Sequence, residues 1–372
     1  MVRILWPFPM TKSTRKRKMV GTNVNCLVCI VRLLTIGSAP KPKRAKVDDE
    51  TKKDPTPIRA DWVQGQDMPY LVLARVFAQI EDVTSRKAIQ KYLTDLFTNI
   101  IQYSPNDLLP CIYLCVCTQL APPFENVQIG IGDSLLMKAI GEATGTKQQH
   151  VKQQYQKEGD LGLVAKKSRS NQRTLGFVKP KPLYVAQVYK KFRDIAAVSG
   201  NRSQDRKVSV IKSLLVSSRE NEAQYIIRGL QGKLRIGLAE KTILMSLADA
   251  VAQRDQCKPE KAVDLVKRAF CECPSYDALV PALLKHGVTD IKAHCHLQPG
   301  IPVSPMLARP TKCYSVVFDR FANRPFTCEY KYDGERAQIH ITNRKTVKIF
   351  SRNFEDSTER FPDVISSVLK VH

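Results

Sequence analysis

A short polar segment toward the C-terminal end combines a lysine with acidic residues, a glycine and an arginine. It reads Glu329-Tyr-Lys331-Tyr-Asp333-Gly334-Glu-Arg336 and has the form K-x-D-G-x-R. A lysine amine is a nucleophile only when it is deprotonated, and a nearby cation such as Arg336, together with partial burial, favours the neutral amine. Glu329 faces the same side of an extended chain as Lys331. Gly334 lets the backbone approach a nucleotide closely, and Arg336 can hold a phosphate or ribose oxygen. The segment predicts a lysine that attacks a nucleotide phosphate; a strand end with solvated charges is the alternative.

Two alternating segments follow and predict a β-hairpin. Apolar residues occupy every second position over 337–341 and again from 347, which is the period of a strand with two different faces. Residues 343–345 lie between the segments as a turn. Arg352 follows the second segment, so the hairpin would bring it back to the edge of the sheet that carries Arg336.

Upstream of the hairpin, apolar residues recur with helical spacing, and no convincing alternating strand occurs between about 62 and 290. Leu108 to Leu120 is apolar almost all round, so a central buried helix is expected there. Thr84 and Ser85 suit the start of the helix that follows them, and Asp133 is expected to cap another. Helices are expected at 70–80, 89–100, 108–120, 134–143, 185–195, 208–216, 222–230, 240–252 and 262–270.

These patterns divide the chain into four parts. Residues 1–60 form a basic tail whose prolines and mixed charges predict disorder. Residues 61–298 form a helical domain, 299–312 a proline-rich connector, and 313–372 the beginning of a β-containing domain. An isolated hairpin leaves its sheet edges and apolar faces uncovered. We therefore expect the chain to be incomplete, and its last part to be loosely packed unless it rests on the helices.

The composition indicates the kind of partner. Lys and Arg number 59 against 35 acidic residues, for a net charge of +24, which predicts attraction to phosphate polymers or an anionic membrane surface. The 11 cysteines fall largely inside apolar runs, as reduced buried cysteines do, and indicate an intracellular protein. Cys26 and Cys29, and the group Cys271, Cys273, His294, Cys295 and His296, lack the paired spacing of a zinc site, so no metal site is predicted.

The tail carries two candidate targeting signals. The basic cluster from Lys41 to Lys46 predicts a nuclear localisation signal, with a solvated linker as the alternative. No acidic residue occurs before Asp48, which also fits a mitochondrial presequence. The apolar stretch from Val24 to Ile36 is too short to span a bilayer, so no membrane segment is predicted.

An ordered set of segments is more specific than any of these patterns: 108–114, 158–163, 232–240, 302–310, 328–341 and 347–363. Together they resemble the eukaryotic ATP-dependent DNA ligases. The first three resemble parts of that family's helical DNA-binding domain, the fourth its entry to the adenylation domain, and the last two its motifs I and III. The resemblance covers about residue 62 to the end. It implies a mainly α fold, in which an all-α DNA-binding domain precedes the beginning of an α+β nucleotidyltransferase domain.

The resemblance also implies roles for residues of the lysine segment and of the hairpin that follows it. Lys331 would form a phosphoramidate with AMP, Glu329 would recognise the adenine, and Arg336 and Arg352 would contact the ribose and phosphates. ATP and Mg²⁺ are the implied cofactors. Nicked double-stranded DNA is the implied partner, in replication, repair and recombination.

The chain also departs from the family pattern. The family's later acidic and lysine motifs and its terminal OB-fold do not occur, so we expect this chain to be inactive alone. The tail contains no motif for a sliding clamp, which leaves a clamp partner open, and a monomer is expected.

Two glycine-containing turns are the expected DNA-binding elements of the helical domain. They run from Gly159 to Gly162 and from Gly232 to Gly237 and resemble an internal repeat. Glycine at a helix start lets backbone amides approach phosphates, and such contacts do not read base sequence. The expected DNA-binding residues are Gly159, Gly162, Lys166, Lys167, Arg169, Arg173, Gly232, Lys233, Arg235 and Gly237. The alternative is an ordinary pair of helix connections with exposed basic residues.

Two other functions remain open at this point. Messenger-RNA capping enzymes and RNA ligases share the K-x-D-G segment, although a large helical domain ahead of the lysine argues against them. A non-catalytic protein that binds nicked DNA without sealing it is the second alternative.

Overall fold

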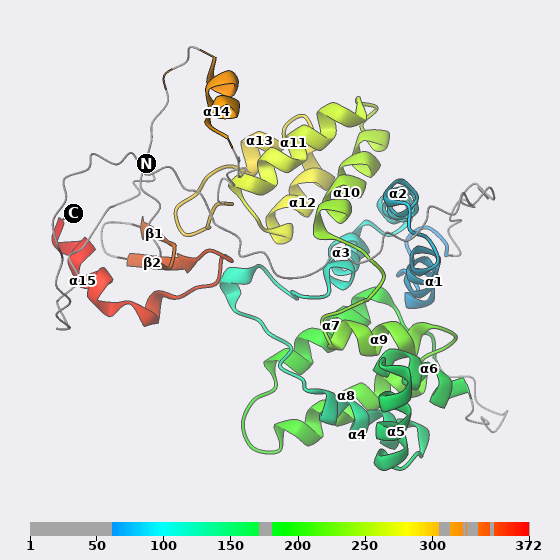
Figure 1. The fold of residues 1–372 in the computed structure, drawn as a ribbon. Coiled ribbons are helices and arrows are strands. Elements are labelled where there is room, and N and C mark those ends of the chain that lie inside the picture. Colours follow the sequence, from blue (N-terminus) through cyan, green and yellow to red (C-terminus); the bar gives the residue numbers. More distant parts are fainter. Residues whose placement is uncertain are drawn as a thin grey trace.

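The computed structural model describes residues 62–170, 181–304, 313–322, 325, 334–342 and 346–371 (Figure 1). The helical part comprises α1 (Tyr70–Glu81), α2 (Arg86–Tyr103), η1 (Pro105–Asp107), α3 (Leu108–Val116), η2 (Pro123–Glu125), α4 (Asp133–Thr144), α5 (Gln148–Glu158), α6 (Leu161–Ser170), α7 (Val185–Ala197), α8 (Ser203–Ser217), α9 (Glu222–Leu230), α10 (Glu240–Arg254), α11 (Pro259–Glu272), α12 (Tyr276–His286) and α13 (Ile291–His294). The predicted mainly α fold is confirmed.

The helical part packs around one continuous hydrophobic core. In it α2 packs on α10, α6 on α9, and α4 on α8; the helices are drawn in Figure 1. The predicted central helix is present as α3, which is buried and contacts α7, α10 and α12. It ends at Val116 and not at Leu120, because Cys117 takes a left-handed backbone with φ of 53°.

Of the predicted helix caps, the structure confirms Ser85 and does not confirm Asp133. Ser85 caps α2, and its side chain accepts a hydrogen bond from the Ala88 amide. The prediction that Asp133 caps α4 was wrong, because Gly132 is the capping residue and has no side chain to offer. Asp133 lies inside the first turn, where its carboxylate accepts hydrogen bonds from Tyr155 and Gln231 at 3.1 and 2.8 Å.

Several helices were missed by the periodicity argument, and their sequences explain why. Helix α5 is polar on almost every side, and Val151 is its only buried residue. Helix α12 contains Pro281, a residue that ordinarily ends a helix. In both cases tertiary packing overrides a weak or contrary local signal.

The predicted hairpin is present as β1 (Ala337–Thr342) and β2 (Thr346–Ser351), paired antiparallel. The predicted turn at 343–345 lies outside the described residues. After β2 come η3 (Thr358–Arg360) and α15 (Pro362–Val371). The apolar side chains of both strands pack with Val368 and its neighbours on α15, which covers one face of the sheet.

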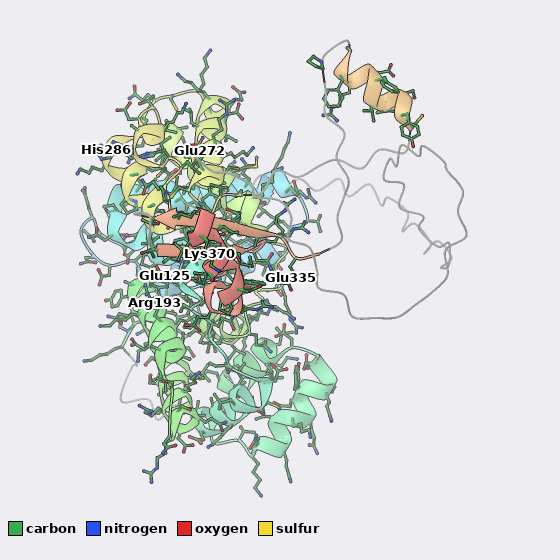
Figure 2. The ribbon with its side chains drawn as sticks, turned by 90° about the vertical axis from the view of Figure 1, so that its left-hand side faces the viewer. Glu125, Arg193, Glu272, His286, Glu335 and Lys370 are labelled. Carbon is green, nitrogen blue, oxygen red and sulfur yellow. The ribbon has the colours of Figure 1, made fainter. Side chains whose placement is uncertain are left out.

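The other face of the hairpin rests on the helical domain (Figures 1 and 2). Phe350 of β2 is fully buried, and its ring meets Phe124 of η2 edge-on with 6.5 Å between the centroids. Asn126 donates a hydrogen bond to the carbonyl of Asp356 at 3.0 Å. Helix α14 (Tyr314–Phe321) contributes no buried residue. The hairpin thus rests on the helices, which is the condition under which loose packing was not expected from the sequence.

The described part of the chain contains no helix with the length and apolar character needed to cross a bilayer.

Candidate DNA and nucleotide interfaces

Arg228 on α9 joins the two glycine-containing turns in the interior of the helical domain. Its guanidinium contacts Asp160, in the first turn, with Nη2–Oδ2 and Nε–Oδ2 distances of 2.8 and 3.0 Å. It also donates two hydrogen bonds to Glu81 of α1, each at 2.9 Å, and one to the carbonyl of Leu234, in the second turn, at 3.1 Å. The Arg228 side chain is 3% exposed. A buried guanidinium of this kind requires partners for all its donors, and the two turns supply most of them.

The electrostatics of this cluster favour the charged forms. Burial by itself disfavours a charged Arg228, but hydrogen bonds to Glu81 and Asp160 outweigh it and raise the arginine pKa. Burial likewise opposes ionisation of Glu81, but hydrogen bonds from Arg228 and Tyr225 lower its pKa below the usual value. The cluster therefore holds a cation between two carboxylates.

A second contact joins the turns at the surface. Arg235 has a left-handed backbone with φ of 60°, and its Nη1 donates a hydrogen bond to the carbonyl of Gly159 at 2.8 Å. Gly159 itself has a φ of 70°, which favours glycine at this position. The turns that resemble each other in sequence thus lie side by side and form one edge of the domain.

Gly162 is buried and permits close helix packing. A Cβ atom at this position would lie 2.7 Å from the carbonyl oxygen of Gln224 and 2.8 Å from Cγ of Arg228, both on α9. The amide of Gly162 donates to Asp160 at 2.8 Å. Close packing of α6 on α9 therefore explains why a glycine occupies this position. Contact of Gly162 with DNA stays a prediction.

The other predicted DNA-binding residues differ in their surroundings. Those at the joined edge are exposed: Gly159, Lys233, Arg235 and Gly237. The other described residues of this set have partners within the protein or are half-buried. Lys167 pairs with Glu158 at 2.6 Å, Arg169 donates to the carbonyl of Val216 at 2.6 Å, and Lys166 and Gly232 are half-buried. Arg173 lies outside the described residues.

The hairpin places the two predicted nucleotide-binding arginines at one end. Ala337 pairs with Ser351 in the strand register, so Arg336 just before β1 and Arg352 just after β2 flank the same end of the sheet. Both arginines are exposed, and two exposed cations together suit an anionic ligand such as a polyphosphate. The predicted nucleophile Lys331 and its companion Glu329 lie outside the described residues.

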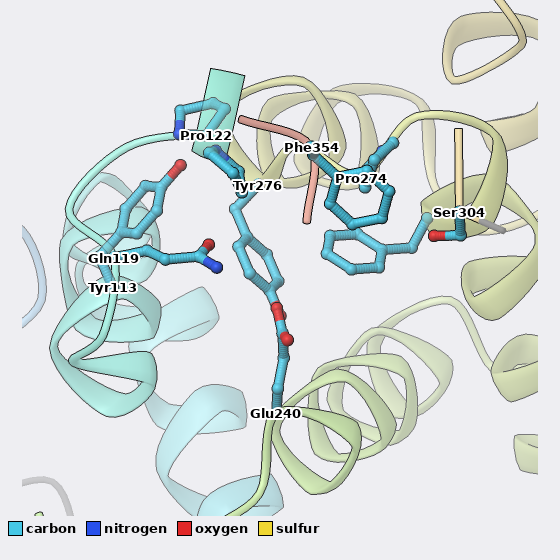
Figure 3. Close-up of a pocket in the computed structure, with 10 residues that line it drawn as sticks. Tyr113, Gln119, Pro122, Glu240, Pro274, Tyr276, Ser304 and Phe354 are labelled. Carbon is cyan, nitrogen blue, oxygen red and sulfur yellow. The ribbon is translucent and has the colours of Figure 1, made fainter. Parts of the chain in front are cut away.

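The turn that carries Arg352 also touches the helical domain (Figure 3). Phe354, with φ of 68°, lines a cavity of about 150 Å³ together with Phe270, Tyr276 and Glu240 of the helices. The Tyr276 hydroxyl donates to Glu240 at 3.2 Å. Burial raises the pKa of Glu240 although this hydrogen bond acts in the opposite direction.

No group of three or more histidine, cysteine, aspartate or glutamate side chains in the described ranges could hold a metal ion. Cys26 and Cys29 lie outside those ranges. Cys273 and Cys295 are buried, and burial raises the pKa of both thiols, which disfavours the thiolate that zinc binds.

The cluster of Arg228, Asp160 and Glu81 was not predicted from the sequence. A signal for it was present, since Arg228 interrupts the otherwise apolar end of α9 and Asp160 stands within a segment already singled out. What the sequence could not supply was the partner, because Glu81 lies 147 residues from Arg228.

Comparison with known families gives two consecutive matches. The family described as DNA ligase N terminus matches residues 69–248, and the family described as ATP dependent DNA ligase domain matches residues 305–372. The first match covers both glycine-containing turns, and the second covers the lysine segment and the hairpin.

Individual relatives agree with these matches. The chain is 43% identical to DNA ligase 1 of Dictyostelium discoideum, over 84% of this chain and 28% of that protein. It is 42% identical to DNA ligase 1 of Drosophila melanogaster, over 82% of this chain and 42% of that protein. A DNA ligase of Pyrobaculum arsenaticum is 36% identical, over 81% of this chain and 49% of that protein. The chain thus spans less than half the length of these relatives.

Proposed function

Because the chain belongs to the family of ATP-dependent DNA ligases and is similar to DNA ligase 1, we propose that it acts in the ATP-dependent sealing of nicks in duplex DNA. The observation that carries the proposal is the order of the two family matches, a DNA ligase N terminus followed by the ATP-dependent domain, over most of the chain. The helical domain would hold the duplex, and the hairpin would form part of the nucleotide pocket.

Lys331 is the proposed nucleophile. Its neutral amine would attack the α-phosphorus of ATP, forming a P–N bond as the bond to pyrophosphate breaks. The AMP would pass from Lys331 to the 5′-phosphate at the nick, and the 3′-hydroxyl would then displace it, so that a phosphodiester bond forms and AMP leaves. Glu329 would recognise the adenine.

Arg336 and Arg352 would balance the charge of the nucleotide phosphates. Their shared position at one end of the hairpin supports this role, because fixed cations stabilise negative charge on a phosphoryl group during transfer. Mg²⁺ would offset further phosphate charge.

The edge formed by the two turns is the proposed DNA contact. Exposed backbone at Gly159 and Gly237, beside the exposed cations of Lys233 and Arg235, suits phosphate contacts that are independent of base sequence. That property matches the needs of an enzyme that must accept any nick. Residues 41–46, which lie outside the described ranges, would direct the protein to the nucleus, with the mitochondrion as the alternative. Roles in DNA replication, repair and recombination follow from the same proposal.

A second candidate function is binding to nicked DNA without sealing. It is supported by the exposed cations Lys233 and Arg235 beside the joined turns, because phosphate contacts of this kind hold a duplex without any adenylation chemistry.

One experiment separates the two candidates. The purified chain is incubated with a nicked duplex, Mg²⁺ and radioactive ATP or GTP, and both the protein label and the sealed product are measured. The ligase proposal predicts protein label from ATP and not from GTP, together with sealed product. Binding without sealing predicts bound duplex and no sealed product, and label from GTP would contradict the ligase proposal.

A further inference from the structure

We propose that Gln338 and His340 are positioning residues that set the orientation of the nucleotide-binding hairpin relative to the DNA-binding domain. The inference rests on the proposed function, since it concerns how the two working surfaces of a ligase are held together. It starts from the polar face of β1, which points away from α15 and toward the connector that leaves the helical domain.

Gln338 holds the connector through two reciprocal hydrogen bonds. The amide of Val303 donates to Oε1 of Gln338 at 2.9 Å, and Nε2 of Gln338 donates to the carbonyl of Val303 at 2.6 Å. A side-chain amide thereby satisfies both backbone groups of one residue, as a neighbouring strand would do. The next amide along, that of Ser304, donates to the carbonyl of Cys271 on α11 at 2.9 Å. The connector is thus bonded to the helical domain on one side and to β1 on the other.

His340 makes the second attachment two residues further along the same face of β1. The amide of Gly300 donates to Nδ1 of His340 at 3.0 Å. An imidazole nitrogen that accepts a hydrogen bond carries no proton, so the ring is in the tautomer protonated at Nε2. The residue is 6% exposed, and Phe350 stands edge-on to its ring at 5.0 Å. This ring is therefore held by packing as well as by its hydrogen bond.

The two attachments bear directly on the nucleotide end of the hairpin. Arg336 precedes Gln338 by two residues. Because β1 is attached to the connector at two points, the end of the strand next to Arg336 has little freedom to rotate against the helical domain. Phe350 against Phe124 and the bond from Asn126 to Asp356 brace β2 against the same domain. We call Gln338 and His340 the clasp, because their hydrogen bonds attach β1 to the connector. Other residues make the contacts with the nucleotide.

Amide hydrogen exchange of the full chain tests the clasp without requiring ligase activity. Gln338→Leu should speed exchange at Val303, and His340→Leu should speed it at Gly300, each by about two- to tenfold, the worth of one hydrogen bond. His340→Asn keeps an acceptor at a similar position and should restore protection at Gly300. The exposed residue Lys370 on α15, which covers the opposite face of the hairpin, provides the control, since Lys370→Met should leave both amides unchanged. Unchanged exchange at Gly300 and Val303 in the two leucine variants, with helical content intact by circular dichroism, would overturn the clasp.

Cross-linking tests its consequence for DNA. A photoreactive benzoylphenylalanine replaces the exposed Asn353 beside Arg352, and its cross-links to an end-labelled nicked duplex are mapped. We expect one cross-linked position in the parent chain, and a spread over several positions in Gln338→Leu and His340→Leu at equal affinity for intact duplex. The same single position in all variants would overturn the positioning role. Absence of any duplex binding by the parent chain would instead contradict the proposed function, while the exchange results would still decide the clasp.

Discussion

Arg228 and Asp160 form an ion pair with 2.8 Å between Nη2 and Oδ2, although 68 residues separate them along the chain. Their side chains are 3% and 7% exposed. Arg228 lies on α9, which leads into the second glycine-containing turn, and Asp160 lies in the first. The ion pair therefore fixes the position of one turn relative to the other.

Removing the arginine should therefore cost far more than removing a surface ion pair. Arg228→Met leaves the buried carboxylate of Asp160 without its cation, and breaking a buried pair in this way costs about 3–5 kcal/mol. Arg75→Met, which breaks the exposed pair of Arg75 with Glu220, should cost no more than about 1 kcal/mol. Urea unfolding of both variants measures the difference, and equal losses would show that the buried cluster has no special weight.

A methyl group at Gly162 should disturb the packing of α6 on α9. Gly162→Ala places a Cβ within 2.7 Å of a backbone oxygen, and overpacking of this kind costs about 1–3 kcal/mol. Gly132→Ala is the matched control, because the nearest atom to its Cβ, Oγ of Ser134, is 4.0 Å away. The midpoints of thermal unfolding should separate the two variants clearly. A fully stable Gly162→Ala protein would mean that the two helices can move apart at little cost.

Lys233 and Arg235 should contribute to DNA affinity on any sequence. Replacing both with alanine should weaken binding to unrelated duplexes alike, and should reduce the slope of log affinity against log salt by about one for each phosphate group that the protein no longer neutralises. Lys261→Ala on the exposed face of α11 serves as the control. Fluorescence anisotropy over a series of salt concentrations gives both quantities. A loss of affinity confined to one DNA sequence would point to base contacts, and the proposed phosphate contacts would then be wrong.

Lys331 should be essential for the enzyme–AMP adduct. Both Lys331→Ala and Lys331→Arg should abolish labelling by ATP and nick sealing, because alanine has no amine and a guanidinium stays protonated and cannot attack. Lys348→Arg on the neighbouring strand should retain the label. Gel detection of a normal adduct in either Lys331 variant would place the nucleophile elsewhere.

Glu222 should make the protein less stable as the pH rises. Burial raises the pKa of this carboxyl to about 7, from 4.5, so the folded state binds the proton more tightly than the unfolded state. Its contribution is fully present below about 4.5 and is lost as the pH rises through about 7. Glu222→Gln removes this titration and should gain roughly 1–3 kcal/mol relative to the parent between pH 5 and pH 8. The exposed Glu260→Gln variant should follow the parent, and parallel curves for all three proteins would refute the prediction.

The helices and the hairpin were largely predictable because their signals are local. Most helices follow from residues three and four apart, and the two strands from alternate residues, so their existence did not depend on neighbours in space. Where the local signal was weak, as in α5, or contrary, as at Pro281 in α12, the prediction missed the helix. Of the candidate sites, the position of Arg352 beside Arg336 followed from the hairpin alone, and the strand register agrees with it.

The sequence by itself determined the family, the order of its N-terminal helical part and its ATP-dependent ligase part, and the periodic elements. Only the tertiary structure decided which distant groups meet: Arg228 with Asp160 and Glu81, Arg235 with the carbonyl of Gly159, and Gln338 with the backbone of Val303. The physical reason is that each such contact depends on how two elements pack, α6 on α9 or β1 on the connector. Packing is settled by the whole core, so the sequence of one segment can mark an unusual residue but cannot identify its partner.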